Sequence, residues 1–347
     1  MRSIGRRRVL ALGGCLVAQY LWARSNLSFA RTKMRNSVPI QFGVISDAHL
    51  NLDSIENRSF GETGLRCLRA TVKALNEEDL DLVLIMGDLL YDGELHNLVE
   101  AKRVLNCLKA PYYIVAGNHD YRPMDPSRQH AGCSYISIED FVQAFKGHGY
   151  RGSGERYWAR ELKSGLRLIG LDGCLVDEPV SYGGHLPQQQ MSWLRRQLAG
   201  HKKDLHIIML HHNVVHWGND AQSLKGRWFS LENSEEIRAL LADYSASIAV
   251  VLSGHRHVGL RKRRLADIDY MVVPSISAYP MRYGIFKLSD SELRWRTPDV
   301  PVGNDTHRLA RAQLIRDPRP SFFNNMSEKE IVAFCENSRL VEGASQL

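Results

Sequence analysis

Five short polar clusters constrain the fold of this 347-residue chain more than any other feature. Each cluster directly follows a short apolar run of the kind that forms a buried strand. Strands of one sheet bring their carboxyl ends to a common edge, so the clusters are expected to converge there. In chain order they are Asp47-Ala48-His49, Gly87-Asp88, Gly117-Asn118-His119-Asp120, His211-His212 and Gly254-His255-Arg256-His257.

Strand-like runs alternate with helical patterns from residue 40 to residue 298. This alternation predicts a layered α/β fold, and the closing group of short strands predicts antiparallel pairing. The predicted strands are Gln41–Ser46, Leu82–Met86, Tyr112–Ala116, Leu166–Leu171, His206–Leu210, Ile248–Leu252, Tyr270–Val273, Tyr283–Leu288 and Glu292–Arg296. The predicted helices are Gly64–Asn76, Leu95–Leu108, Ile138–Phe145, Pro187–Ala199 and Ser234–Tyr244.

The side chains of the clusters are those of a site for two metal ions in a hydrolase. Imidazole nitrogens and carboxylate oxygens bind divalent transition metals, and glycines let the backbone turn sharply at the sheet edge. Taken alone, Gly87-Asp88 is an ordinary turn, and His211-His212 is a histidine pair near the core. Five clusters in the right places favour the metal site. One metal would take Asp47, His49 and His257, the second would take Asn118, His211 and His255, and Asp88 would bridge them.

Read in order, the clusters resemble the signature of the calcineurin-like metallophosphoesterase superfamily over roughly residues 40–290. Their spacing looks most like the group of cyclic-nucleotide and glycerophosphodiester phosphodiesterases. The resemblance implies a four-layer α/β/β/α sandwich with the dimetal site at the C-terminal edges of the strands. It also implies hydrolysis of a phosphate ester, by a phosphodiesterase or a phosphomonoesterase, through a metal-bridging hydroxide.

The resemblance assigns roles to two further residues and leaves the metal open. His119 would face the substrate as a catalytic residue, with Asp120 orienting it. The cofactors would be two divalent or trivalent transition metal ions, Mn, Fe or Zn. Two positions depart from the family pattern, since Asn213 stands where a proline is frequent and Arg256 stands where a small residue or threonine is frequent. The alternative function is a metal-binding but non-catalytic interaction scaffold of the same fold, with anchoring to a membrane as an option.

Candidate substrate contacts lie near the later clusters. Arg256, His216 and Trp217 are expected to line the pocket, although Trp217 could instead anchor its loop. The basic run Arg261–Arg264 either meets an anionic substrate or forms the solvated edge of a hairpin. The segment Tyr121–Ser137, rich in proline and glycine and without periodicity, is the candidate loop that shapes the substrate pocket. The expected partner is a small-molecule or lipid phosphate ester.

The N-terminus has the three parts of an export signal in their usual order. Arg6-Arg7-Arg8 precedes the apolar stretch Val9–Trp22, and Ser28-Phe29-Ala30 supplies small residues for cleavage. Paired arginines favour the twin-arginine (Tat) route. The stretch of 14 residues is short for a membrane span. The protein is therefore expected to be periplasmic or extracellular, with a signal anchor that stays uncleaved as the alternative.

The N-terminal segment also holds most of the net charge and sets the first predicted domain boundary. The formal net charge is +7, and residues 1–30 hold +5 of it, which leaves no general electrostatic reason for the rest to bind nucleic acid. The predicted divisions are 1–30 export signal, 31–39 linker, 40–298 metallophosphoesterase domain and 299–347 C-terminal appendage with a short helix. Cys133 and Cys174 lie in loop-like segments where a disulfide is one option.

Overall fold

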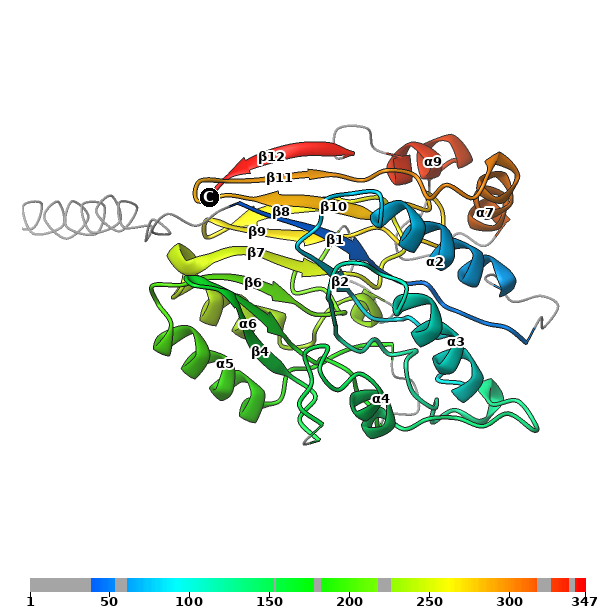
Figure 1. The fold of residues 1–347 in the computed structure, drawn as a ribbon, viewed down its shortest axis with the longest axis horizontal. Helices are drawn as coiled ribbons and strands as arrows, with labels where there is room; N and C mark the ends of the chain where they lie inside the picture. Colours follow the sequence, from blue (N-terminus) through cyan, green and yellow to red (C-terminus); the bar gives the residue numbers. More distant parts are fainter. Residues whose placement is uncertain are drawn as a thin grey trace, which may run out of the picture.

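Two six-stranded sheets form the centre of the molecule (Figure 1). The computed structural model describes residues 39–53, 61–152, 154–177, 182–217, 226–316, 326–336 and 341–347. The export signal predicted at 1–30, and the linker at 31–39 apart from its last residue, lie outside these ranges. None of the described helices combines the length and the apolar character needed to cross a membrane.

The first sheet has the strand order β12-β11-β10-β1-β2-β3. The three strands β1, β2 and β3 run parallel to one another, and β10, β11 and β12 add antiparallel pairs on the other side of β1. Its members are β1 (Ile40–Ile45), β2 (Leu82–Ile85), β3 (Tyr112–Ile114), β10 (Gly284–Leu288), β11 (Glu292–Arg296) and β12 (Glu342–Gln346).

The second sheet has the order β4-β5-β6-β7-β9-β8, with β5, β6, β7 and β9 parallel and antiparallel strands at both edges. Its members are β4 (Trp158–Lys163), β5 (Leu166–Gly170), β6 (Leu205–Met209), β7 (Ile248–Ser253), β8 (Arg261–Leu265) and β9 (Ile268–Val272).

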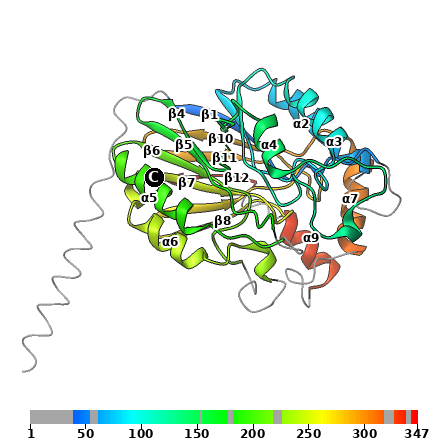
Figure 2. The same ribbon diagram turned by 90° about the horizontal axis from the view of Figure 1, so that it is seen from below.

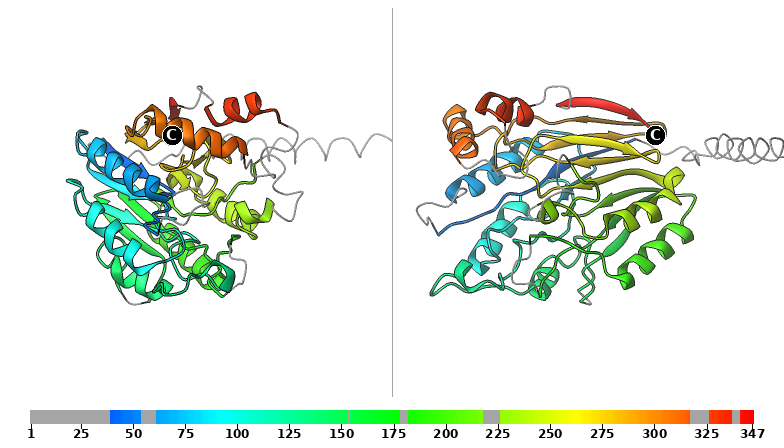
Figure 3. Two further views of the ribbon diagram at one scale, coloured as in Figure 1. Left: turned by 90° about the vertical axis from the view of Figure 1, so that its right-hand side faces the viewer. Right: turned by 180° about the vertical axis from the view of Figure 1, so that it is seen from behind.

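Helices cover the outer faces of both sheets, so the predicted four-layer α/β/β/α sandwich is confirmed (Figures 2 and 3). One side carries α2 (Gly61–Leu75), α3 (Leu95–Leu105) and α4 (Ile138–Ala144), and the other carries α5 (Gln188–Gly200) and α6 (Ser234–Ala242). Two further helices follow the last predicted strand, α7 (Asn304–Arg316) and α9 (Glu328–Glu336).

Alternation along the strands divides the apolar side chains between two cores. In β6, Ile207 and Met209 join the large core that lies between the sheets, whereas Ile208 joins the smaller core beneath α5 and α6. Strand β5 alternates in the same way, and β7 does so from Val250 to Leu252. Because both faces are buried, these strands read as continuous apolar runs, which is why the sequence identified them.

Three strands absent from the prediction, β4, β8 and β12, all lie at sheet edges. Edge strands carry charged or polar side chains that discourage pairing with other chains, and such sequences lack the apolar signal of a central strand. The basic run Arg261–Arg264 forms most of β8, in line with a hairpin edge, and Lys262 lies 3.3 Å from Asp269 of β9.

The C-terminal segment is more than the predicted appendage. It contains the short helix expected there, α9, but also α7, and β12 pairs with β11 from Glu292↔Gln346 to Arg296↔Glu342. The sheet therefore continues past residue 298. The five cysteines of the described residues are all free, Cys133 and Cys174 among them.

Candidate metal centre

The structure places the five polar clusters at the ends of five strands, three in the first sheet and two in the second. Asp47 and His255 are 208 residues apart in the chain, yet the backbone N–H of His255 donates to both carboxylate oxygens of Asp47 at 3.0 and 3.1 Å. The convergence predicted from the strand ends is therefore present. The strands that lead into the clusters are β1, β2, β3, β6 and β7.

Five of the predicted ligands have left-handed backbone conformations. A non-glycine residue in this region costs about 1–3 kcal/mol and persists only where its surroundings hold it, most often at functional sites. Hydrogen bonds between the loops after β1 and β2 provide that support, from Asp47 N to Gly87 O (3.1 Å) and from His49 N to Asp88 O (3.0 Å). The φ angles are 53° at Asp47, 44° at His49, 49° at Asp88, 72° at His255 and 51° at His257.

The first group of converging side chains comprises Asp47, His49, Asp88 and His257, all buried, with ligand atoms within 4.8 Å of one another. The Nε2 atoms of His49 and His257 face each other at 2.8 Å, and His257 Nε2 lies 3.1 Å from Asp47 Oδ1. The hydroxyls of Ser275 and Ser277 donate to the Asp47 carbonyl, each at 2.8 Å, and so fix this loop.

The second group comprises Asp88, His211 and His255, also buried and within the same 4.8 Å limit. His211 Nε2 lies 3.0 Å from His255 Nδ1 and 3.1 Å from Asp88 Oδ2. The other ring nitrogens contact backbone carbonyls, His211 Nδ1 at Met86 (2.8 Å) and His255 Nε2 at Trp228 (2.6 Å). Such outer contacts fix the tautomer and leave the inner nitrogen as an acceptor.

Asp88 belongs to both groups, as a bridging ligand must. Its Oδ2 atom lies 3.5 Å from His49 Nε2 and 3.1 Å from His211 Nε2. Burial opposes ionisation, but His211, His119 and His49 together hold the pKa of Asp88 well below its usual range. The bridging carboxylate is therefore ionised.

Asn118 supplies an independent indication of a bound ligand. Its side chain is 2% exposed, and neither its Oδ1 nor its Nδ2 has a hydrogen-bond partner among the described residues. Leaving buried polar atoms unpaired costs free energy, so a group beyond the protein is expected to contact them. Ligand atoms 2.0–2.2 Å from an ion lie roughly 3 Å apart, close to the N···N distances of 2.8 and 3.0 Å here. The residues fit two transition metal ions.

His119 follows Asn118 and lies beside this centre, with its ring centroid 4.8 Å from that of His49. Its Nδ1 atom contacts the Tyr91 carbonyl and lies 3.2 Å from Asp92 Oδ1. Arg128 Nη2 also lies 3.1 Å from Nδ1. The two acceptors, the Tyr91 carbonyl and Asp92, favour a hydrogen on Nδ1, which leaves Nε2 for another partner. Burial alone would lower the pKa of His119, but the charges of Asp88 and Asp92 raise it.

The carboxylate that orients His119 is therefore Asp92, which corrects the prediction of Asp120. Asp120 Oδ2 accepts from the Gly117 N–H (2.8 Å), and its Oδ1 accepts from the Leu90 N–H (2.9 Å). Its role is to hold the loops after β2 and β3 together. Burial and the charge of Asp88 raise the pKa of Asp120 to about 7.

Sequence reasoning also missed Arg128 and Tyr182, which lie beside His119, and Trp228, which lies next to Tyr182 and whose carbonyl contacts His255. Arg128 ion-pairs with Asp92, and its guanidinium lies 5.3 Å from the Tyr182 ring centroid. Tyr182 lies 6.3 Å from His119 and 5.1 Å from Trp228, ring centroid to centroid. Arg128 comes from the Tyr121–Ser137 loop, which was predicted to shape the pocket, but nothing in the sequence singled out that arginine.

The candidate substrate contacts His216, Trp217 and Arg256 make contacts within the protein. The Nδ1 and Nε2 atoms of His216 lie 2.7 and 3.0 Å from the hydroxyls of Ser230 and Ser234. Trp217 packs against the smaller core, which favours the alternative that it anchors its loop. Arg256 is 2% exposed, with its guanidinium 5.4 Å from the Phe229 ring centroid.

Comparison with known proteins agrees with this geometry. Residues 40–259 match the family model described as calcineurin-like phosphoesterase. The chain is 26% identical over 247 residues to a 3',5'-cyclic-nucleotide phosphodiesterase of Nostoc sp., covering 70% of this chain and 80% of that relative. It is 27% identical over 189 residues to a probable glycerophosphodiester phosphodiesterase of Arcobacter nitrofigilis, covering 51% and 56% of the two chains.

The fold itself recurs in a solved structure. A dimetal phosphatase from Danio rerio superposes with a TM-score of 0.57 at 16% identity, covering 74% of this chain and 95% of that one. At this identity the likeness shows the arrangement of sheets and helices only.

Proposed function

Because the chain belongs to the calcineurin-like phosphoesterase family and is a metal-dependent phosphoester hydrolase, we propose that it cleaves small phosphodiesters that carry a nucleobase, foremost 3',5'-cyclic nucleotides. The observation that carries this choice is the pair of aromatic rings Tyr182 and Trp228, of which Tyr182 lies beside both His119 and Arg128. Aromatic rings stack bases, and a guanidinium binds phosphate oxygens. The name of the Nostoc relative points to the same class of substrate, whereas the name of the Arcobacter relative points to glycerophosphodiesters, which serve as the comparison below.

In the proposed site, Asp47, His49 and His257 would hold one metal ion, and Asn118, His211 and His255 would hold the other, with Asp88 available to both. Metal ions there would lower the pKa of a water molecule and offset charge on the phosphoryl oxygens. The thiolate-free set of imidazole and carboxylate ligands suits Mn, Fe or Zn.

Two side chains of the protein, His119 and Arg128, would act on the phosphate ester itself. His119, held at Nδ1 by the Tyr91 carbonyl and Asp92, is positioned to donate from Nε2 to the leaving oxygen as the P–O bond breaks. Arg128 is fixed by Asp92 and is oriented to bind a non-bridging phosphate oxygen. Asp92 thus positions both residues.

A substrate panel tests this proposal. The metal-loaded protein would be assayed with 3',5'-cyclic AMP, glycerophosphoethanolamine and a phosphomonoester, with metal content measured in parallel. The proposal expects the highest kcat/KM for the cyclic nucleotide, and Trp228→Ala should raise KM for that substrate but not for glycerophosphoethanolamine. A preference for glycerophosphoethanolamine that is unchanged in Trp228→Ala would refute the nucleobase part, while the hydrolase activity would stand.

We also propose that the protein is exported by the twin-arginine route and acts in the periplasm or outside the cell. Arg6-Arg7-Arg8, the apolar stretch Val9–Trp22 and the small residues at 28–30 support this. Mass determination of the mature N-terminus together with cell fractionation tests it. A cytoplasmic protein that keeps residue 1 would contradict export, whereas a membrane-bound one that keeps Val9–Trp22 would indicate a signal anchor.

A further inference from the structure

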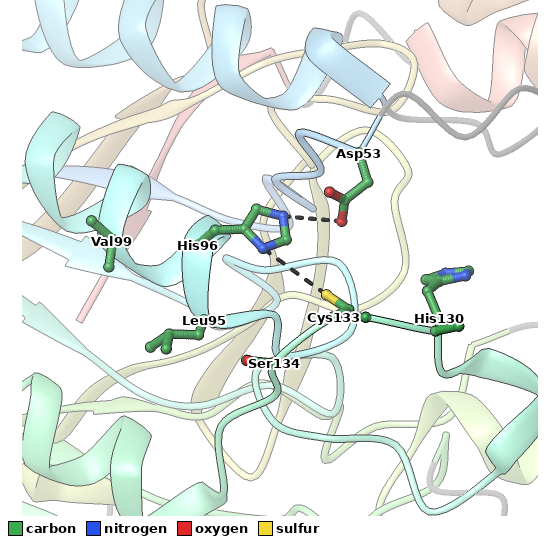
Figure 4. A pocket seen from close by; sticks show the side chains of 9 residues that line it. Asp53, Leu95, His96, Val99, His130, Cys133 and Ser134 are labelled. Carbon is green, nitrogen blue, oxygen red and sulfur yellow. Dashed lines mark hydrogen bonds and ion pairs between the residues drawn. The ribbon is translucent and has the colours of Figure 1, made fainter.

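A second group of metal-binding side chains lies outside the candidate metal centre. Asp53, His96 and Cys133 offer a carboxylate oxygen, an imidazole nitrogen and a sulfur that all lie within 4.8 Å of one another. They come from three separate segments, namely the residues that follow β1, the first turn of α3 and the Tyr121–Ser137 loop. Together they line a hollow of about 700 Å³ (Figure 4).

From this arrangement we infer that Asp53, His96 and Cys133 form a zinc-binding site distinct from the candidate metal centre. Zn²⁺ binds thiolate, imidazole and carboxylate ligands, whereas Mg²⁺ and Ca²⁺ select oxygen ligands. A thiolate and a carboxylate together balance the two positive charges of the ion. No ligand of the candidate metal centre contains sulfur, so the two kinds of site differ in chemistry.

The backbone already holds the three residues together. Leu95 N–H donates to the Ser134 carbonyl (2.8 Å) and Ile136 N–H donates to the Gly93 carbonyl (2.9 Å), which ties the loop of Cys133 to the start of α3. Leu52 N–H donates to Asn97 Oδ1 (3.0 Å), which ties the segment of Asp53 to the same helix. The ligands thus sit on a preformed frame, which lowers the entropy lost on binding.

The distances need only a local adjustment to hold the ion. His96 Nε2 lies 3.0 Å from Asp53 Oδ2, and His96 Nδ1 lies 4.0 Å from Cys133 Sγ (Figure 4). Ligand atoms of a tetrahedral zinc site are roughly 3.3–3.8 Å apart, from Zn–N, Zn–O and Zn–S bonds of about 2.0–2.3 Å. One imidazole nitrogen binds the ion, so one neighbour must turn toward it. The Asp53 and His96 side chains are 35% and 39% exposed, which leaves room for this rotation.

A fourth ligand would come from elsewhere in the lining of the hollow, since the converging group holds only three residues. His130 lines the same hollow, and its Nε2 atom is buried without a hydrogen-bond partner within the described ranges. It lies on the Cys133 loop, three positions earlier in the sequence. Water from the open side of the hollow is the alternative occupant of this position.

The proposed zinc site shares the Tyr121–Ser137 loop with a residue near the candidate metal centre. Arg128, which ion-pairs with Asp92, lies on the same loop as Cys133. A zinc ion that joins Cys133 to α3 would therefore stabilise the position from which Arg128 contacts Asp92 and His119.

Cobalt substitution tests the proposal, because a Co²⁺–thiolate bond gives an intense near-ultraviolet charge-transfer band. The full chain, stripped of metal with a chelator, would be titrated with Co²⁺. The expected result is a charge-transfer band in the parent protein and in Cys107→Ser, the matched control at another accessible thiol, and no band in Cys133→Ser. His96→Gln and Asp53→Asn should each weaken Co²⁺ binding as judged by this band, and they check the result if Cys133→Ser folds poorly.

Zinc stoichiometry gives the second readout. After loading with Zn²⁺ and removal of free metal, Cys133→Ser should hold one ion fewer per chain than Cys107→Ser, and zinc should protect Cys133 from iodoacetamide. A parent protein without the cobalt–thiolate band, or a Cys133→Ser variant with the band and zinc content of the control, would overturn the proposal.

Discussion

Replacing Asp92 by asparagine removes the negative charge beside His119 while keeping the shape of the side chain. Asp92 is 1% exposed, its Oδ1 lies 3.2 Å from His119 Nδ1, and the same oxygen pairs with Arg128. It is absent from both groups of converging metal ligands. Asp92→Asn should therefore lower turnover without removing metal.

The size of the effect follows from the lost contact. A hydrogen bond that involves a charged group contributes about 1.5–3 kcal/mol. If that contribution is lost in the transition state, kcat falls roughly 10- to 150-fold, since about 1.4 kcal/mol corresponds to a factor of ten. The pKa of His119, which Asp88 and Asp92 raise against the effect of burial, should also fall.

The assay is kcat as a function of pH for four proteins, namely the parent, Asp92→Asn, His119→Ala and the double variant, each with measured metal content. If Asp92 acts through His119 as well as Arg128, Asp92→Asn costs less in the His119→Ala background than in the parent, and the remaining loss is its effect on Arg128. An equal fold loss in both backgrounds, or full activity of Asp92→Asn, would refute the assignment.

Four further outcomes are expected. Asp88→Ala should lose bound metal, measured by elemental analysis, because both ligand groups share that carboxylate. His119→Ala should keep its metal and lose about 10²–10⁴-fold in kcat, the usual contribution of a general acid. Gly117→Ala should lose metal affinity in a binding titration, since a Cβ there would overlap the Asp88 carboxylate. Burial lowers the pKa of His206 to about 4, so the unfolded chain takes up a proton at this side chain before the folded protein does as the pH falls from 6.5. The free energy of unfolding should therefore drop by about 2 kcal/mol by pH 5. The accompanying fall in Tm should be smaller in His206→Leu than in the parent.

Asp120→Asn is the matched comparison for Asp92→Asn. An asparagine has one acceptor oxygen, so it cannot accept from both Gly117 N–H and Leu90 N–H as Asp120 does. Leaving a buried N–H unpaired costs about 1–3 kcal/mol, and the effect should appear as a lower Tm. A normal Tm combined with a shifted pH profile of kcat would instead favour the role first predicted for Asp120.

The central strands could be predicted because burial on both faces demands apolar side chains in sequence. Strands β5, β6 and β7 meet this condition, and the prediction located them to within a residue or two. The edge strands β8 and β12 could not be recognised, because an edge needs no apolar face, and Arg261–Leu265 is mostly basic. Pairing between β11 and β12 exists only once the chain has folded back on itself.

The sequence alone determined the ligand types and their placement, because a metal centre needs particular side chains and each follows a strand whose apolar run is visible. Asp47, Asp88 and His255 could be named in this way. Only the tertiary structure decided which residues contact and orient His119. Asp92 and Arg128 reach it through loop conformations that follow no periodic pattern, and Asp120, adjacent to His119 in sequence, points instead to backbone N–H groups. Adjacency in the chain does not fix the direction of a side chain in a turn, whereas a strand end fixes where its residues meet.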